Sequence, residues 1–335
     1  MADTFNYRID HHGSLVRPAG LDRGDPDSLD AAIVEAVAYQ RTLRSTVVTD
    51  GGYPYEDFRG VVLDGVSGVR RTGATGADGL AVWVAEALPK ADGPLAADRA
   101  RRLTELTVIA PKVTLPAPSY LAATLYDPAA RGPASARELG EAFAEIIRAE
   151  IARLVDTGVR LIQLDNPLLL AATGPEETPV GALSFADALA VDAPAVRLDT
   201  RPEGVRIGVF PGAVAPAAVD RAKAERLYTQ VPADRWVLPL LHASAAELDL
   251  VRALPEDRDV CFGVVDAATS GPADIDPVLD RLDAAGELKD LEDAAVAPSR
   301  GFADIADRPL LTAEDQRRRI VLVETVARYI WGNEF

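Results

Sequence analysis

Short apolar runs alternate along the chain with longer segments in which apolar residues recur every three or four positions. The first pattern is typical of buried strands, and the second is typical of helices with one buried face. The predicted strands lie at the start of 6–18 and at 46–49, 80–84, 106–110, 112–120, 159–164, 195–199, 205–210, 236–241, 260–265 and a final apolar segment that ends at 296. The predicted helices lie at 27–43, 135–158, 217–228, 245–254, 274–285 and 312–331.

Capping residues mark the ends of two of these helices. Ser135 followed by Glu138 is a capping box, in which the two side chains satisfy free N–H groups of the first turn. Gly158 ends the same helix, since glycine readily adopts the left-handed conformation found just after a helix. Thr312 and Asp315 give a weaker signal of the same kind at the start of the last helix.

The order of these elements predicts the fold class. Strands that alternate with helices favour a parallel sheet in an α/β protein. The length alone allows either one large barrel or two ordinary domains. About eight strand–helix units without a Gly/Ser linker favour a closed (β/α)8 TIM barrel, with residues 1–335 as one domain. The segment 70–110 is less regular, and we expect strands with short helices or an excursion from the barrel there.

Composition narrows the class of partner. The chain has 335 residues, 48% of them hydrophobic, and a net charge of −17. An acidic protein is a poor general binder of nucleic acids or anionic membranes, because clustered Lys and Arg hold phosphates. The lone Cys261 excludes an intramolecular disulfide, and no apolar stretch approaches the length of a membrane span. We therefore expect a cytoplasmic protein that acts on a small molecule, with homo-oligomerisation left open.

Polar residues follow many of the predicted strands. In a parallel barrel the active site lies at the C-terminal ends of the strands, so these residues are the candidates for chemistry. Any one of them is as well explained by a cap or a turn, and it is their recurrence that favours a site. They are His11, His12, Ser14, Arg17, Asp50, Ser119, Tyr120, Asp165, Asn166, Asp199, Thr200, Arg201, His242, Asp266, Ser299 and Arg300.

Five stretches, in this order, resemble the cobalamin-independent methionine synthase family, most closely its single-domain, C-terminal-type members. The resemblance covers nearly the whole chain. It implies a barrel shared with uroporphyrinogen decarboxylase. In standard members it implies methyl transfer from 5-methyltetrahydrofolate to a thiol held on zinc. The stretches are Asp-His-His-Gly-Ser-Leu-Val-Arg-Pro (10–18), Val-Val-Thr-Asp-Gly (47–51), Val-Thr-Leu-Pro-Ala-Pro-Ser (113–119), Ile-Gln-Leu-Asp-Asn-Pro (162–167) and Arg-Gly-Phe (300–302).

The sequence departs from the family at the zinc ligands. The family's His-x-Cys pair aligns with Leu198 and Thr200, and its last ligand cysteine aligns with Arg300. The glutamate ligand falls near Pro239, in a loosely aligned segment. A glutamate that holds the amino group of homocysteine in the family is replaced by Gly52. We therefore expect no zinc, a substrate other than homocysteine, and Cys261 as a core residue.

Other family positions are kept. Ser14 and Asp165 match residues that hold the substrate's amino-acid moiety, and 113–119 matches a wall of the pocket. Arg17, Arg201 and Arg300 would make the mouth cationic and suited to an anionic small molecule, because guanidinium binds carboxylate or phosphate bidentately. The equal alternative is that these arginines pair with Asp50, Asp165 or Asp199 and replace the metal structurally.

Two functions of different classes follow. The first is a zinc-independent enzyme for methyl or other one-carbon transfer with folate, or for carbon–sulfur cleavage, in which His11 or His12 is the acid/base and Asp165 orients the substrate. The second is an inactive binding or regulatory homologue. Decarboxylation rests on shared fold alone and is weaker. The expected substrate-binding residues are Ser14, Arg17, Asp50, Ser119, Tyr120, Asn166, Thr200, Arg201 and Arg300.

Overall fold

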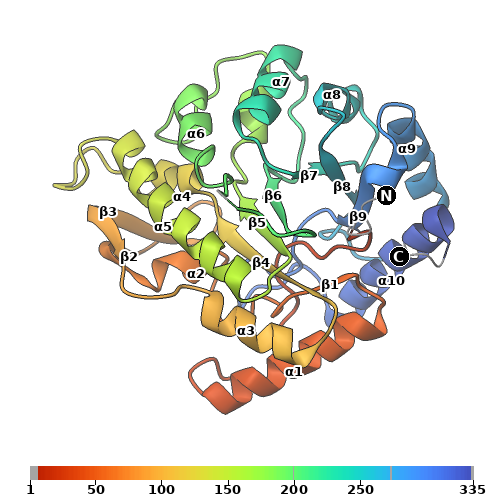
Figure 1. Cartoon of the computed structure of the whole chain (residues 1–335), viewed down its shortest axis with the longest axis horizontal. Helices are drawn as coiled ribbons and strands as arrows, with labels where there is room; N and C mark the ends of the chain where they lie inside the picture. Colours follow the sequence, from red (N-terminus) through yellow and green to blue (C-terminus); the bar gives the residue numbers. More distant parts are fainter. Residues whose placement is uncertain (1–6, 199, 272–273, 333–335) are drawn as a thin grey trace.

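A curled parallel sheet forms the centre of the molecule (Figure 1). The computed structural model describes residues 7–198, 200–271 and 274–332. Each strand of this sheet runs parallel to its neighbours, in the order β1-β4-β5-β6-β7-β8-β9. The strands are β1 (Val47–Val48), β4 (Ala110–Pro116), β5 (Leu161–Asp165), β6 (Arg206–Phe210), β7 (Arg235–Pro239), β8 (Asp259–Val265) and β9 (Ala294–Pro298).

The segment around Ile9 closes the sheet into a barrel. On one side Val296 donates its N–H to the carbonyl of Arg8 at 2.8 Å, and Asp10 donates to the carbonyl of Val296 at 3.0 Å. On the other side Thr46, just before β1, donates to the carbonyl of Ile9 at 3.1 Å. This segment therefore lies between β9 and β1 as the eighth position of the barrel, and the predicted α/β barrel is confirmed.

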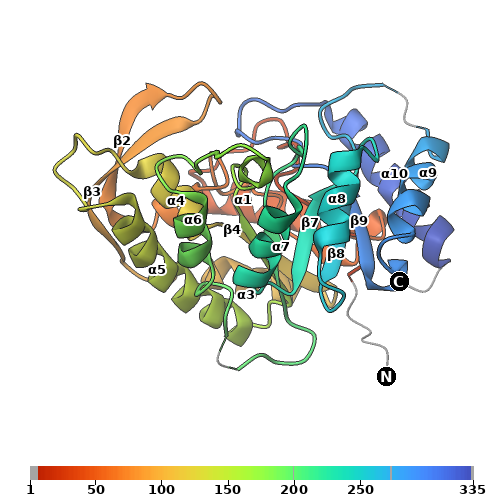
Figure 2. The same ribbon diagram turned by 90° about the horizontal axis from the view of Figure 1, so that it is seen from above.

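Helices cover the outside of the barrel (Figures 1 and 2). Ser135 and Thr312 cap α5 and α10 as expected, each accepting the N–H of the third residue after it. None of the described helices combines the length and the apolar character needed to cross a membrane. The helices are α1 (Pro26–Thr42), α2 (Gly60–Leu63), α3 (Ala97–Leu106), α4 (Pro118–Leu125), α5 (Ala136–Asp156), α6 (Phe185–Asp192), α7 (Arg221–Gln230), α8 (Ala245–Ala253), α9 (Asp276–Gly286) and α10 (Ala313–Trp331), with 3-10 turns η1 (Leu170–Thr173) and η2 (Leu291–Asp293).

An antiparallel hairpin interrupts the barrel pattern after α2. It consists of β2 (Val66–Thr75) and β3 (Ala81–Ala91), and Figure 2 shows it projecting beside α4 and α5. The strand predicted at 80–84 belongs to this hairpin and not to the barrel. The expected excursion in the segment 70–110 is thus confirmed.

Three predicted elements are corrected. Residues 106–110 are not a strand, because α3 continues to Leu106 and β4 begins at Ala110. Residues 195–198 form turns after α6, in which Ala195 donates to the carbonyl of Asp192 and Arg197 to that of Pro194; Asp199 lies outside the described residues. The predicted Pro-rich loop at the end of 112–120 instead begins α4, since proline is well tolerated in the first turn of a helix.

Candidate active site

Three buried charges lie inside the barrel below the site. Asp10 on the closing segment accepts from Lys112 Nζ of β4 at 2.8 Å and lies 3.3 Å from the guanidinium of Arg235 of β7. Burial alone would raise the pKa of Asp10, but the two cations hold it below its usual value. Lys112 also donates to the carbonyl of His11 at 2.8 Å, so this cluster fixes the start of the loop that carries the predicted histidines.

The two predicted catalytic histidines are buried. Burial lowers the pKa of His11 to about 4 and that of His12 to about 3, so both rings are neutral at pH 7. Gln163 Nε2 lies 2.7 Å from His12 Nδ1. An amide N–H can only donate, which assigns the accepting role to Nδ1 and the ring proton to Nε2. Neither ring nitrogen of His11 has a hydrogen-bond partner among the described residues.

Asp165, which lines a cavity of the barrel, has a pKa close to neutrality. It is the last residue of β5, and its Oδ1 accepts from the same Gln163 amide at 2.7 Å. Burial raises its pKa to about 7, against the opposing effects of the Gln163 hydrogen bond and the charge of Lys112. Gln163 thus joins His12 and Asp165 through one amide nitrogen, and the carboxyl is half-protonated close to physiological pH.

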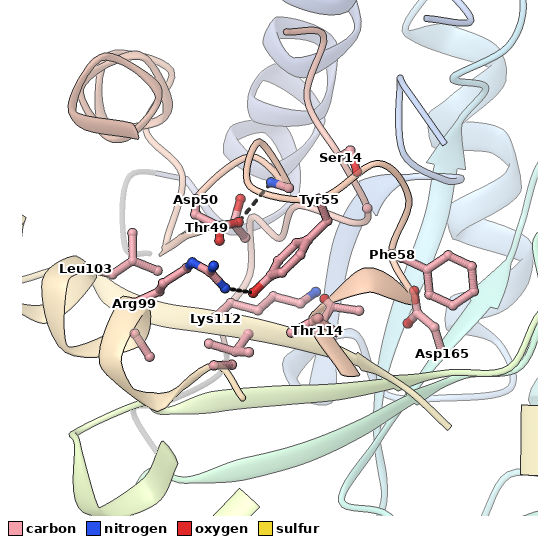
Figure 3. A pocket seen from close by; sticks show the side chains of 16 residues that line it. Ser14, Thr49, Asp50, Tyr55, Phe58, Arg99, Leu103, Lys112, Thr114 and Asp165 are labelled. Carbon is pink, nitrogen blue, oxygen red and sulfur yellow. Dashed lines mark hydrogen bonds between the residues drawn. The ribbon is translucent and has the colours of Figure 1, made fainter. Parts of the chain in front are cut away.

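A cavity of about 70 Å³ lies at the C-terminal ends of β1, β4 and β5 (Figure 3). Such a volume is several times what one ordered water needs, about 10–15 Å³. Ser14, Asp50 and Asp165, all predicted from the sequence, meet here. Burial also raises the pKa of Asp50. The labelled walls of the cavity are Ser14, Thr49, Asp50, Tyr55, Phe58, Arg99, Leu103, Lys112, Thr114 and Asp165.

Close backbone approaches between loops shape the rim. A Cβ atom on Gly13 would lie 2.5 Å from the Cα of Gly301, so the loop after the closing segment and the turn after β9 cross only because both residues are glycines. Gly52 has φ +68°, and a Cβ there would lie 2.5 Å from Ser14 Oγ. The space beside Ser14 is therefore closed where the family carries a glutamate.

The three predicted arginines do not converge. Arg300 pairs with Asp304 beside the mouth. Arg17 donates to the carbonyls of Gly52 and Tyr55 at 2.7 Å and so stabilises the loop between β1 and α2. Arg201 pairs with Asp234, which immediately precedes β7, so Arg201 lies at the N-terminal end of the strands. Thr200, also before β6, is exposed at that same end.

Ser119 and Asn166 form a buried network behind the site. The Ser119 hydroxyl donates to Asp192 of α6 at 2.6 Å and accepts from the Asn166 amide at 2.7 Å. Burial raises the pKa of Asp192 to about 6. Tyr120 is buried with its ring centroid 5.2 Å from that of Phe58, a cavity wall residue. These predicted substrate-binding residues lie outside the cavity lining, Ser119 and Tyr120 on α4 and Asn166 directly after β5.

The residues present do not fit a zinc–thiolate site. Leu198 lies before β6, at the opposite end of the barrel from the cavity, which corrects its alignment and that of Thr200 with ligand positions. At the C-terminal end of β6, on the cavity side of the barrel, the next residues are Pro211 and Gly212, and neither has a side chain that could bind zinc. Burial raises the pKa of the Cys261 thiol inside β8 to about 11. In the described ranges no three His, Cys, Asp or Glu side chains come together as a metal site.

Four site residues escaped sequence reasoning. Lys112 and Gln163 carried a signal, since each is a polar residue inside an otherwise apolar strand and must find a buried partner. Arg99 on α3 and Tyr55 on the loop before α2 carried none, because only the tertiary fold brings them to the cavity.

Comparisons with known proteins bear on the fold. No protein-family model matches the chain, and no curated protein matches it. Among solved structures, a B12-independent methionine synthase from a Shewanella species, in complex with selenomethionine, has a TM-score of 0.77 at 19% identity over 97% of both chains. A putative vitamin-B12-independent methionine synthase from Listeria monocytogenes has 0.76 at 18% identity over 98% of both. A methyltransferase from Methanosarcina mazei has 0.58 at 11%, covering 98% of this chain and 97% of that one. At such identities the likeness shows the fold, and it confirms the methionine synthase-like barrel.

Proposed function

We propose that this protein is an enzyme that acts without zinc on a small anionic substrate other than homocysteine. The reaction is a methyl or one-carbon transfer, or carbon–sulfur bond chemistry. The observation that carries the proposal is the Asp165 carboxyl, which has a pKa of about 7 and faces a cavity at the C-terminal ends of the strands. Perturbed carboxyls in such cavities are characteristic of acid/base catalysis.

Asp165 exchanges the proton in this proposal. Both reaction classes release a basic atom, a thiolate or an amine nitrogen, which must take up a proton. A carboxyl with a pKa near the working pH is the most effective donor or acceptor, since both protonation states are populated. Gln163 holds the carboxyl by its amide, and the neutral His12 on the other side of that amide keeps Gln163 in place.

The fold neighbours favour this chemistry. The structure of the Shewanella protein is a complex with selenomethionine, an amino acid with a selenium–carbon bond. Ser14 and Asp165 are the positions that the family resemblance assigns to the amino-acid moiety of the substrate, and both line the cavity. The methyl donor that the resemblance implies, 5-methyltetrahydrofolate, is accordingly the first probe.

The test is turnover by the wild-type protein and by Asp165→Asn, which keeps the shape and removes the titrating group. Each protein is incubated with 5-methyltetrahydrofolate and a panel of small thiols, and separately with thioether carboxylates, and products are identified by mass spectrometry. We expect turnover by the wild type and a loss of about 100-fold or more in the variant, typical of removing an acid/base group. Asp283→Asn, on the exposed face of α9, is the matched control.

A second candidate is a binding or regulatory protein without catalysis. It is favoured by the Arg300–Asp304 pair, which occupies the turn where the family carries its last ligand cysteine. Thermal stabilisation by one of the probes with no product from any of them would support this reading over the first. Zinc bound stoichiometrically to the purified protein would contradict both.

A further inference from the structure

The wall of the barrel opens between β1 and β4. Their pairing ends at Val48 and Pro111, although β4 continues to Pro116 alongside β5. Thr49, the residue directly after β1, is hydrogen-bonded to Gln40 of α1. Its N–H donates to Gln40 Oε1 at 3.0 Å, and its carbonyl accepts from Gln40 Nε2 at 2.8 Å. A side chain of a covering helix thus replaces the strand partner.

The cavity lies at this opening and continues past it. Thr49 and Asp50 line one side and Lys112 to Thr114 the other, so the cavity reaches from Asp165 to the inner face of α3. There Ala96, Ala100 and Leu103 give it apolar walls. Figure 3 shows the side chain of Arg99 entering the same space from α3. The cavity therefore has a proton-exchanging end at Asp165 and a cationic end at Arg99.

The guanidinium of Arg99 is held in position by Tyr55, without direct contact to a carboxylate of the described residues. Its Nη1 donates to the hydroxyl of Tyr55 at 2.8 Å, and its carbon lies 5.0 Å from the centre of that ring. Within the part of the chain that the structure describes, no carboxylate is within 4.0 Å of Arg99. Asp50 and Asp64 lie within electrostatic range of it, and burial raises the pKa of both.

Lys112, the other cation of the cavity, is differently placed. Its Nζ lies 2.8 Å from Asp10 Oδ1 and 2.8 Å from the carbonyl of His11. Its ammonium group is therefore already engaged by two oxygen acceptors inside the barrel. Arg99 is an exposed residue, so the remaining N–H donors of its guanidinium can bind a ligand at little desolvation cost.

We propose that Arg99 is the specificity-determining residue of the site and binds a carboxylate at the far end of the substrate, through the opening between β1 and β4. This rests on the proposed function, because it places the reacting end of the same molecule at Asp165. The substrate class is then an elongated small carboxylate whose apolar middle contacts Leu103 and Val113. The hydroxyl of Tyr55 orients the guanidinium.

Binding of succinate by the full-length protein, measured by isothermal titration calorimetry, tests the proposal. Inorganic phosphate and propylamine are the comparison probes. We expect succinate to bind the wild type, Arg99→Gln to bind it about tenfold more weakly or worse, as for the loss of a charge-assisted hydrogen bond, and Tyr55→Phe to show a smaller loss. Arg101→Gln, two residues along α3 in a surface pair with Asp98, is the matched control and should bind as the wild type does.

Three results would overturn the proposal. They are equal succinate affinity of Arg99→Gln and the wild type, binding of phosphate or propylamine in place of succinate, and no binding of succinate by the wild type. Circular dichroism of each variant confirms that it is folded. Asp165→Asn separates this proposal from the previous one, because it should lose turnover while it keeps succinate binding.

Discussion

Burial sets the charge state of the residues at the site. The same desolvation that leaves His11 and His12 neutral at pH 7 moves the titration of Asp165 up to that pH. Desolvation disfavours the charged form of either group, so it lowers the pKa of a base and raises that of an acid. The ordinary pKa of histidine makes His11 or His12 the acid/base candidate in the sequence. In the folded protein our proposal assigns this role to the carboxyl of Asp165.

The raised pKa of Asp165 makes a stability prediction. Its pKa of about 7 in the folded state exceeds the ordinary value of 3.8, so the folded protein binds more protons between these pH values. The contribution of Asp165 to the free energy of unfolding therefore falls as the pH rises from 4 to 7, by about 1.4 kcal/mol per unit of pKa shift, and is constant above that. Asp165→Asn removes this fall.

Urea unfolding of both proteins at pH 4.5, 6 and 8 checks it. We expect the stability of Asp165→Asn relative to the wild type to increase across the series by a few kcal/mol. Asp192, whose pKa is also raised, is present in both proteins and cancels in the difference. A difference that stays constant with pH would contradict the buried, ionisable state of Asp165.

At the scale of elements, one helix side chain decides how far two strands pair. Gln40 is fully buried and bonds both backbone groups of Thr49, as well as the carbonyl of Ala36 in its own helix. Buried backbone groups must find hydrogen-bond partners, so the Gln40 amide takes the place of the hydrogen bonds that a neighbouring strand would make with Thr49. The opening beside Arg99 is a product of that substitution.

Gln40→Leu should destabilise the protein. The replacement is of similar size but leaves the N–H and carbonyl of Thr49 without partners, at about 1–3 kcal/mol for each unsatisfied buried group. Urea unfolding at pH 7 measures the loss, and Gln230→Leu at the exposed end of α7 is the control. Equal stabilities for the two variants would show that the Thr49 backbone finds other partners.

Across the whole molecule, the buried charges connect the closing segment to two separate strands of the barrel sheet. Asp10 on the closing segment bonds β4 on one side and β7 on the other, through Lys112 and Arg235. Closure of the barrel therefore includes an ionic contact across its interior. Removing Asp10 leaves two buried cations without compensation, whereas removing all three charged side chains leaves none.

We therefore expect Asp10→Ala to lose about 3–5 kcal/mol of stability, since it leaves two buried cations without their carboxylate. The triple variant Asp10→Leu, Lys112→Met, Arg235→Met should recover much of this loss, because no buried charge of the cluster remains. Urea unfolding midpoints of the three proteins give the comparison. A triple variant less stable than Asp10→Ala would show that these side chains stabilise the barrel by more than mutual neutralisation.

Sequence reasoning succeeded where local patterns determine the structure. The apolar periodicity and caps of α5 and α10 reflect interactions within a few residues, and strand–helix alternation has few compact solutions. The strand at 80–84 was recognised as a strand, but its hairpin partner depends on a distant pairing. Ser14 and Asp165 were found through a motif. Arg99 was not, because nothing near it in the chain marks the face of α3 that meets the cavity.

Gly52 leaves little room for a larger side chain beside Ser14. Glutamate introduced there alone would have to adopt φ +68°, and its Cβ would lie 2.5 Å from Ser14 Oγ and 3.0 Å from Ser14 Cβ. The side chain of Ser14 lies where the Cβ of residue 52 would be. Glutamate at position 52 would therefore require Ser14 to move as well as a strained backbone, so Gly52→Glu alone is not expected to create an amino-group contact at this rim.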